Sequence, residues 1–330
     1  MTTQPVFLQL LADRTGKPAA LAFCAAPDTT AEGLPPALAE LAVQLPCFYR
    51  AGVPADVADA LRGAQWQPLP AHGTLRVDVP FQDLPPGAVL VEGDWPLAPP
   101  AGRGSKQAAS RALALQLVQL VSCDADTHEI EALLRRDPTL SYQLLRLVNS
   151  LGMTGGAGRK ITSFSQAILI LGRHQLRRWL NLMLFAAREG DMRSAMLLAR
   201  VSVRARLMEL LARATGLDKH NQEQAFMTGM FSLLGVLFGS PLRDVLAPLA
   251  IGDAVQRALL DGEGELGTLL AIVCAAECCD GAAVTAGLEA AGVDVADFNG
   301  MTAEANLWML GVMGDIGQDA VAKRGGKRDA

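Results

Sequence analysis

The sequence is poor in aromatic residues, in long apolar runs and in charge. Of its 330 residues, 5% are aromatic, 19% are charged and 50% are hydrophobic. A core with so few rings must be filled mainly by aliphatic side chains, which favours Ala- and Leu-rich helices packed on one another. The length is sufficient for about two domains and at least one substantial core.

Membrane-spanning and disulfide-rich classes are also excluded. The longest apolar runs, at residues 226–239 and 266–276, are shorter than the roughly 20 residues that a bilayer requires. Six cysteines and no signal-peptide pattern do not indicate a disulfide framework, so we expect a soluble, cytoplasmic protein. Cys274, Cys278 and Cys279 lie in an apolar helical pattern without a histidine, which favours buried small side chains over a metal site.

Charge is unevenly distributed along the chain. Residues 1–100 hold 5 basic and 10 acidic side chains, residues 101–220 hold 18 and 9, and residues 221–330 hold 6 and 15. The basic residues of the middle third are scattered singly, and no aromatic residues are interleaved for base stacking. This pattern favours internal pairing with the acidic thirds over nucleic-acid binding.

The hydrophobic period divides the chain into two unlike parts. Short β-type runs and helical runs alternate over residues 1–100, proline and glycine are dense at 96–104, and the period is helical from residue 107. We therefore predict a multidomain protein with a small α/β domain at residues 1–105. An all-α helical bundle follows at 106–316, and a disordered tail at 317–330. The expected strands are 6–10, 75–79 and 88–91, and the expected helices include 36–45, 54–61, 192–214, 226–238, 254–260, 266–279 and 303–313.

Two blocks of the helical part carry a family resemblance. The first, DPTLSYQLLRLVNS at residues 137–150, begins with a good N-cap and a proline suited to the first helical turn. The second, FMTGMFSLLGVLFG at residues 226–239, is a glycine-punctuated apolar helix. Together they resemble the HDOD family, the non-catalytic relatives of the metal-dependent HD phosphohydrolases. The resemblance covers roughly residues 107–309 and implies an all-α HDOD bundle.

The resemblance also bears on catalysis. In the hydrolases a contiguous His-Asp pair holds metal ions that activate water, and the equivalent positions here are Ser232 and Leu233. The four histidines are each followed by a residue other than aspartate, so no such pair exists in the sequence; they are His72, His128, His174 and His220. The resemblance therefore implies a protein that is not an enzyme, with no catalytic residue, no metal and no cofactor.

The form of the second block is similar to the HDOD branch that carries an N-terminal EAL-type, cyclic di-GMP phosphodiesterase-like domain. Residues 6–8, Asp13 and Gly16 with Lys17 are similar to the opening β-hairpin of such domains. No acidic residue occurs in 14–27, where a metal-binding glutamate is expected, and Ala22 lies near that position. A (β/α)₈ barrel needs about 250 residues, so we expect a degenerate EAL-like fragment.

These observations predict a bacterial signal-transduction adaptor that acts through protein–protein interaction with signalling components, away from membranes. Five residues are candidates for the interaction because packing explains the arginines least and the other two end a helix. They are Arg146, Asn149, Ser150, Arg177 and Arg178.

Two alternatives remain open. The first is binding of a cyclic dinucleotide such as cyclic di-GMP, or residual phosphodiesterase activity, although the degenerate N-terminal part disfavours both. The second is nucleic-acid binding through the arginines of residues 173–213, which the lack of interleaved aromatic residues disfavours.

Overall fold

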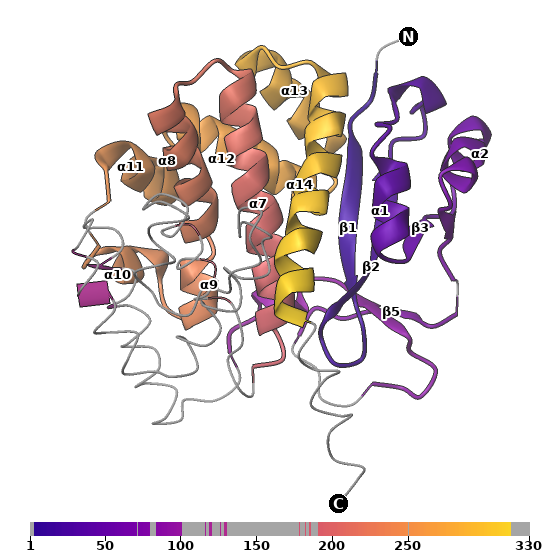
Figure 1. Cartoon of the computed structure of the whole chain (residues 1–330), viewed down its shortest axis with the longest axis horizontal. Coiled ribbons are helices and arrows are strands. Elements are labelled where there is room, and N and C mark those ends of the chain that lie inside the picture. Colours follow the sequence, from indigo (N-terminus) through magenta and orange to yellow (C-terminus); the bar gives the residue numbers. More distant parts are fainter. Residues whose placement is uncertain are drawn as a thin grey trace, which may run out of the picture.

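The computed structural model describes residues 3–70, 72–79, 84–100, 191–249 and 251–317, with a few isolated positions between 116 and 185. A sheet and its flanking helices form one side of this described part, and a helical array forms the other (Figure 1). None of the helices described has the length and apolar character needed to cross a lipid bilayer. The predicted order, an N-terminal α/β part followed by helices, is confirmed.

The N-terminal part is built on a six-stranded sheet of order β4-β3-β2-β1-β6-β5. Strand β1 pairs antiparallel with β2 and β6, whereas the pairs β2–β3, β3–β4 and β5–β6 are parallel. Asp13 closes the β1–β2 turn by accepting the Thr15 and Lys17 N–H groups at 2.7 and 3.0 Å. The strands are β1 (Val6–Ala12), β2 (Pro18–Ala25), β3 (Cys47–Tyr49), β4 (Gln67–Pro68), β5 (Thr74–Arg76) and β6 (Leu90–Glu92).

One face of this sheet packs on two short helices, α1 (Leu38–Gln44) and α2 (Ala55–Gly63). Phe23 meets Trp66 edge to face with ring centroids 6.1 Å apart, and the indole N–H donates to the Leu38 carbonyl at 2.9 Å. The buried indole thus has the polar partner that a tryptophan needs in a core. Two single-turn 3₁₀ helices, η1 (Ala31–Gly33) and η2 (Trp95–Leu97), complete this part.

The helical array begins with α7 because the elements before it fall outside the described residues. Its helices are α7 (Ser194–Ala214), α8 (Lys219–Phe231), α9 (Leu234–Phe238), α10 (Leu242–Leu246), α11 (Asp253–Asp261), α12 (Gly264–Glu277), α13 (Gly281–Ala291) and α14 (Val295–Gly317). The single helix predicted over 226–238 is wrong in its limits. Helix α8 begins earlier, where the Asp218 side chain caps the Asn221 N–H at 2.8 Å, and it ends before Ser232.

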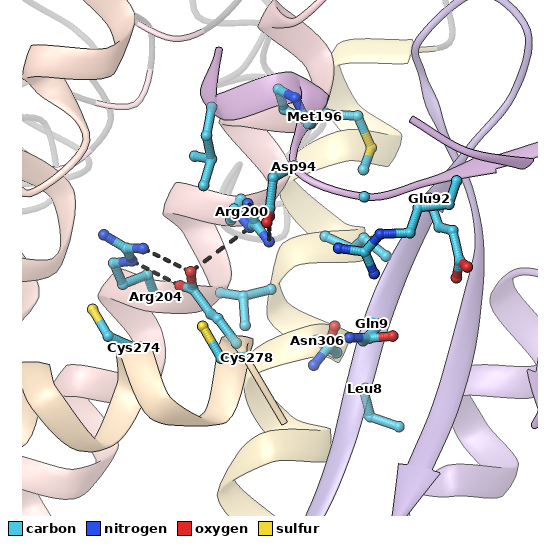
Figure 2. Close-up of a pocket in the computed structure, with 17 residues that line it drawn as sticks. Leu8, Gln9, Glu92, Asp94, Met196, Arg200, Arg204, Cys274, Cys278 and Asn306 are labelled. Carbon is cyan, nitrogen blue, oxygen red and sulfur yellow. Dashed lines mark hydrogen bonds and ion pairs between the residues drawn. The ribbon is translucent and has the colours of Figure 1, made fainter. Parts of the chain in front are cut away.

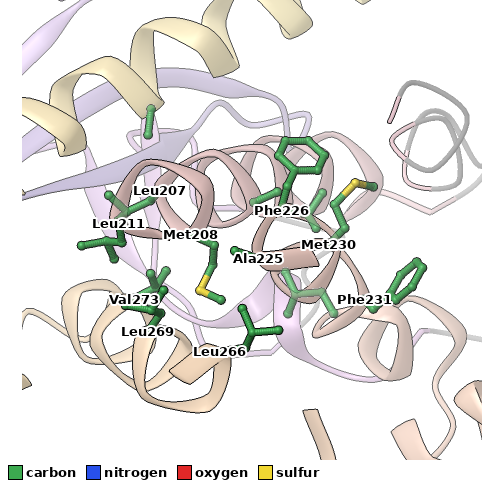
Figure 3. Close-up of a cluster of buried hydrophobic side chains, with 14 of the residues drawn as sticks. Leu207, Met208, Leu211, Ala225, Phe226, Met230, Phe231, Leu266, Leu269 and Val273 are labelled. Carbon is green, nitrogen blue, oxygen red and sulfur yellow. The ribbon is translucent and has the colours of Figure 1, made fainter. Parts of the chain in front are cut away.

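The centre of the array is a cluster of aliphatic, methionine and phenylalanine side chains from α7, α8 and α12 (Figure 3). Gly229 sets the spacing between α7 and α8. A Cβ placed there would lie 2.7 Å from the Ala205 Cα and 3.0 Å from the Arg204 carbonyl oxygen, both backbone atoms. The two helices therefore touch backbone to backbone at this point.

The last helix joins the array to the sheet. Helix α14 lies between α7 and β1 (Figure 1), and its Ala303 packs in the core of the α/β part. The Asn299 side chain is buried beside the first strand, where its Oδ1 accepts the Val6 N–H at 2.9 Å and its Nδ2 donates to the carbonyls of Gln4 and Gly33. The two predicted parts therefore share an interface built from both ends of the described chain.

The predicted limits at residues 105 and 316 stay predictions, because residues 101–115 and 318–330, which include the expected tail, lie outside the described part. The expected strand at 75–79 is shorter and begins earlier than predicted, as β5, and the helix expected at 303–313 is longer, as α14. The helix at 192–214 is confirmed as α7.

Candidate functional site

A cavity of about 410 Å³ lies between the sheet and the helical array (Figure 2). Residues of β1, β6 and η2 form one side, and residues of α7, α12 and α14 form the other. Its wall carries three arginines and three carboxylates, so its charge is balanced. They are Arg76, Arg200, Arg204, Glu92, Asp94 and Glu277.

One part of this wall is an arginine–carboxylate pair between α7 and α12 that is held by several hydrogen bonds. Arg204 binds Glu277 through two parallel hydrogen bonds, Nε to Oε1 at 2.7 Å and Nη2 to Oε2 at 2.6 Å. Its third nitrogen, Nη1, donates to the Ser232 hydroxyl at 2.8 Å, and that hydroxyl donates to the Gly229 carbonyl at 2.6 Å. The guanidinium is thus fixed at the break between α8 and α9, with three donors in use.

The protonation states of this pair follow from its surroundings. Burial alone would raise the pKa of the Glu277 carboxyl, but the charge and hydrogen bonds of Arg204 hold that pKa below its ordinary value. Burial alone would lower the pKa of the Arg204 guanidinium, and the same pairing reverses that effect and raises the pKa. Both groups are therefore charged at neutral pH.

Arg200 is held much more loosely. Its side chain is one turn from Arg204 on α7 and lies 3.5 Å from Asp94 and 3.7 Å from Glu277, at the long end of ion-pair distances. It keeps more exposure than Arg204, at 22% against 9% for the side chains. Among the cationic groups on α7 at this cavity, Arg200 is thus the one with most capacity to bind another anion.

An amide on α14 completes the wall. Asn306 is buried, and its Nδ2 donates to the Thr302 carbonyl at 2.9 Å. Its Oδ1 has no hydrogen-bond partner among the described residues, although a buried carbonyl normally has one. Figure 2 shows this side chain beside Gln9, on the side of the cavity away from Cys274 and Arg204. A ligand with an N–H donor would satisfy it.

Of the two positions that the family resemblance makes equivalent to the His-Asp pair, Ser232 lies against Arg204 of the cavity wall. Ser232 is bound to Arg204 as described, and Leu233 is 3% exposed in the hydrophobic core of the array. Within the described ranges, no group of three or more His, Cys, Asp or Glu residues is placed to hold a metal ion.

The cysteines differ from the prediction. Cys278 is exposed, and Cys274 and Cys279 are half-buried, so the expectation of buried small side chains is wrong for this segment. Cys274 and Cys278 line the cavity because the C-terminal turn of α12 ends there. The apolar pattern of α12 gave no sign of this, since its period does not distinguish a core face from a cavity wall.

Of the five predicted interaction residues, the structure describes Arg178; Arg146, Asn149, Ser150 and Arg177 lie outside the described residues. The Arg178 guanidinium is directed inward. Its Nη2 donates to Glu209 at 2.6 Å, its Nε donates to Glu223 at 2.8 Å, and its Cζ lies 4.2 Å from the centre of the Phe226 ring. This geometry gives Arg178 a role in packing.

We expect Arg178→Met to lower the free energy of unfolding by about 2 kcal/mol, because the partly buried Glu223 loses its cation and Glu209 keeps only Arg206, while the contact with Phe226 is kept. Urea denaturation measures the change. Arg213→Gln is the matched control, since Arg213 is 59% exposed and 3.8 Å from its carboxylate, and its effect should stay below about 0.5 kcal/mol. An Arg178 variant of unchanged stability would contradict the packing role.

Described arginines on α7 and at its N-cap are also paired. Arg206 binds Glu209 and Glu304 at 2.6 Å each, and Arg193 binds Asp191 at 2.8 Å. Pairing with an acidic third, as predicted from the charge distribution, is confirmed for Arg206 with Glu304, Arg204 with Glu277 and Arg178 with Glu223, whereas Arg193 pairs within the middle third.

Comparison with known proteins identifies a family domain in part of the sequence. The HDOD domain matches residues 110–245. The chain is 34% identical over 197 residues to the Cyclic di-GMP phosphodiesterase CdgJ of Vibrio cholerae, covering 59% of this chain and 45% of that protein. It is 32% identical over 142 residues to YuxH of Bacillus subtilis, covering 42% of this chain and 34% of that protein. The chain thus spans less than half the length of either curated relative.

A crystal structure of a protein described as a phosphohydrolase from Shewanella amazonensis SB2B also aligns with this fold. The alignment covers 62% of this chain and 93% of that one, with 15% identity and a TM-score of 0.43. A likeness of this size supports no inference about chemistry.

Proposed function

We propose that this protein, which carries an HDOD domain at residues 110–245, is a non-catalytic bacterial signal-transduction adaptor that acts through protein–protein interaction. One observation carries the proposal: the hydroxyl of Ser232, which the family resemblance makes equivalent to the metal-binding histidine, is bound to the Arg204 guanidinium.

The physical argument is electrostatic. A guanidinium fixed by Glu277 and 2.8 Å from Ser232 Oγ places a permanent positive charge where a divalent ion would have to bind, and like charges at such distances repel. The serine hydroxyl is already engaged as donor and acceptor, and Leu233 offers no ligand atom. What remains of such a bundle is a packed helical scaffold suited to contact with another protein.

The test has two parts. Purified full-length protein, incubated with Mn²⁺ or Mg²⁺, should not hydrolyse cyclic di-GMP or a nitrophenyl phosphodiester above the rate of buffer. Crosslinking in the bacterial host, followed by titration of the recovered candidate as a purified protein, should give saturable binding. Metal-dependent turnover that disappears in Ser232→Ala would overturn the proposal, as would failure of every purified candidate to bind.

A second function, binding of a cyclic dinucleotide without hydrolysis, is favoured by the unpaired amide oxygen of Asn306. A guanine base carries N–H donors that match this oxygen. The loosely held Arg200 has N–H groups that can donate to a phosphate. The curated relative CdgJ is named as a cyclic di-GMP phosphodiesterase, which connects this nucleotide with related chains. The three carboxylates on the same wall oppose an anion, so this function ranks second.

Calorimetric titration with cyclic di-GMP decides between the two functions. Binding at micromolar concentration that weakens about tenfold in Arg200→Gln would establish the nucleotide site, because a hydrogen bond to a charged group contributes about 1.5–3 kcal/mol. No heat in the micromolar range leaves the adaptor function as the better account.

The third function, nucleic-acid binding through the arginines of residues 173–213, is less well supported because the described members are paired with carboxylates. Support for nucleic-acid binding would be a DNA or RNA gel shift whose strength falls steeply as the salt concentration rises.

A further inference from the structure

Two cysteines that are far apart in the sequence meet at the junction of the sheet and the helical array. Cys24 lies on β2, Cys279 follows the end of α12, and both pack against the same hydrophobic cluster. The turn after α12 is held against the first strand, since a Cβ at Gly281 would lie 3.8 Å from Pro5. The same Cβ would lie 4.0 Å from the ring of Phe7, which is the residue paired with Cys24 across β1 and β2, so the turn that carries Cys279 lies beside Cys24.

An arginine lies on the other side of Cys24. Arg50 Nε donates to the Cys24 sulfur at 3.1 Å, while its Nη2 binds Gln9 Oε1 at 2.7 Å and also pairs with Glu92. A guanidinium fixed next to a thiol stabilises the thiolate, which is the reactive form. A hydrogen bond from Cys279, together with the hydrogen bond and the positive charge of Arg50, lowers the pKa of the Cys24 thiol to about 7, against the opposing effect of burial.

The backbone at Cys279 is strained. Its φ is 56°, in the left-handed region, and it occupies the position after a helix end that glycine usually fills. The Asp280 N–H closes that helix end on the Ala275 carbonyl at 3.0 Å. A residue with a β-carbon is disfavoured there, so the backbone conformation gives no reason for cysteine at this position.

We propose that Cys24 and Cys279 form a hydroperoxide-reactive thiol pair that closes a disulfide between β2 and the end of α12. The Cys24 thiolate attacks one oxygen of hydrogen peroxide, the O–O bond breaks, and the released hydroxide takes up a proton to leave as water. The Cys24 sulfenic acid is then attacked by the sulfur of Cys279, which gives up its proton. The S–S bond forms, the S–O bond breaks and a second water leaves, so one peroxide oxidises two thiols.

The position of the pair suits this chemistry. Cys24 is half-buried, and Gln9, which contacts its sulfur, lines the cavity and gives a small peroxide a route to that sulfur. Cys47 is the opposite case, because burial raises the pKa of its thiol to about 12. Cys47 therefore serves as an internal reference for an unreactive cysteine.

The experiment uses the reduced full-length protein. After one equivalent of hydrogen peroxide and alkylation of the remaining thiols, peptide mass mapping should recover Cys24 joined to Cys279. In untreated protein, alkylation of Cys24 should rise with a midpoint near pH 7, while Cys47 stays unlabelled. A map without the Cys24–Cys279 peptide, a Cys24–Cys278 link in its place, or oxidation confined to Cys278 would overturn the proposal.

Variants separate the two roles. Cys279→Ser should leave a sulfenic acid on Cys24 that dimedone traps, and Cys24→Ser should abolish both the disulfide and the trapped adduct. Arg50→Gln should slow oxidation at pH 7 by roughly fivefold, because fewer thiolates are present. Cys274→Ser is the matched control and should retain the Cys24–Cys279 peptide. Loss of the disulfide in this control, or an undiminished rate in Arg50→Gln, would count against the pair.

Discussion

Glu277→Gln is expected to lower the free energy of unfolding by about 3 kcal/mol, because it leaves the Arg204 guanidinium charged and unpaired where its side chain is 9% exposed. Chemical denaturation at neutral pH measures this loss. The double variant Arg204→Met/Glu277→Leu removes both charges and should recover most of the stability, since a buried pair replaced by apolar groups is often neutral. A double variant as unstable as Glu277→Gln would contradict this account.

The same pair predicts a pH dependence. The pKa of Glu277 is lower in the folded state than in the unfolded state. The stability that the charged carboxylate contributes is therefore fully present above the unfolded-state pKa, and it is lost as the pH falls through the folded-state pKa. The Glu277→Gln variant has no carboxyl group at this position, so it does not lose stability by this protonation. The difference in unfolding free energy between the two proteins should therefore shrink below about pH 4.5. Arg243→Gln, which breaks an exposed pair at 3.8 Å, is the control and should change stability by less than about 0.5 kcal/mol.

Gly229→Ala should cost about 3 kcal/mol, at the upper end of overpacking effects, because the new methyl group would lie 2.7 Å from the Ala205 Cα. Backbone atoms cannot rotate away as a side chain can, so α7 and α8 must separate. The movement would also displace Ser232, three residues further along. The melting temperature and the urea midpoint should both fall, and near-ultraviolet circular dichroism should weaken.

Gly311→Ala on α14 makes the matched control for this change. No atom lies within 4 Å of the added Cβ, and the residue is exposed within a helix. Alanine is favoured over glycine in such a position, so stability should rise by about 0.5–1 kcal/mol. If both substitutions changed stability in the same direction, the close contact between α7 and α8 would not be the cause.

Sequence patterns predicted the long helices of this fold better than its short or alanine-rich elements. Helix α7 was recognised because its apolar period continues for 21 residues. Strand β2, with the sequence PAALAFCA, was implied by the resemblance to an opening β-hairpin but not by its own pattern, because it is apolar at nearly every position and shows no alternation. Helix α13 was missed because glycine and alanine give a weak period. The break before α9 was missed because the apolar run continues through it.

The site was less predictable than the fold, for a physical reason. Ser232 and Leu233 could be identified from a local motif. The partner of Ser232 is Arg204, which in the sequence is one of several scattered arginines, and the carboxylate that fixes it lies 73 residues further on. Such a pair depends on how α7, α8 and α12 pack together. The hydrophobic period of a single helix carries no information about that packing. Arg178 illustrates the same limit, since little in its neighbourhood indicated the two glutamates that bind it.

The Asn299 contact has a consequence for biosynthesis. Strand β1 leaves the ribosome before α14 does, and the amide that binds the Val6 N–H is 293 positions further on. During translation one face of the sheet stays exposed to solvent until α14 has left the ribosome. Contacts between residues so far apart in the sequence also slow folding. A nascent chain stalled before residue 295 should therefore expose the apolar side of β1 to chaperones, whereas a chain long enough for α14 to leave the ribosome should cover it.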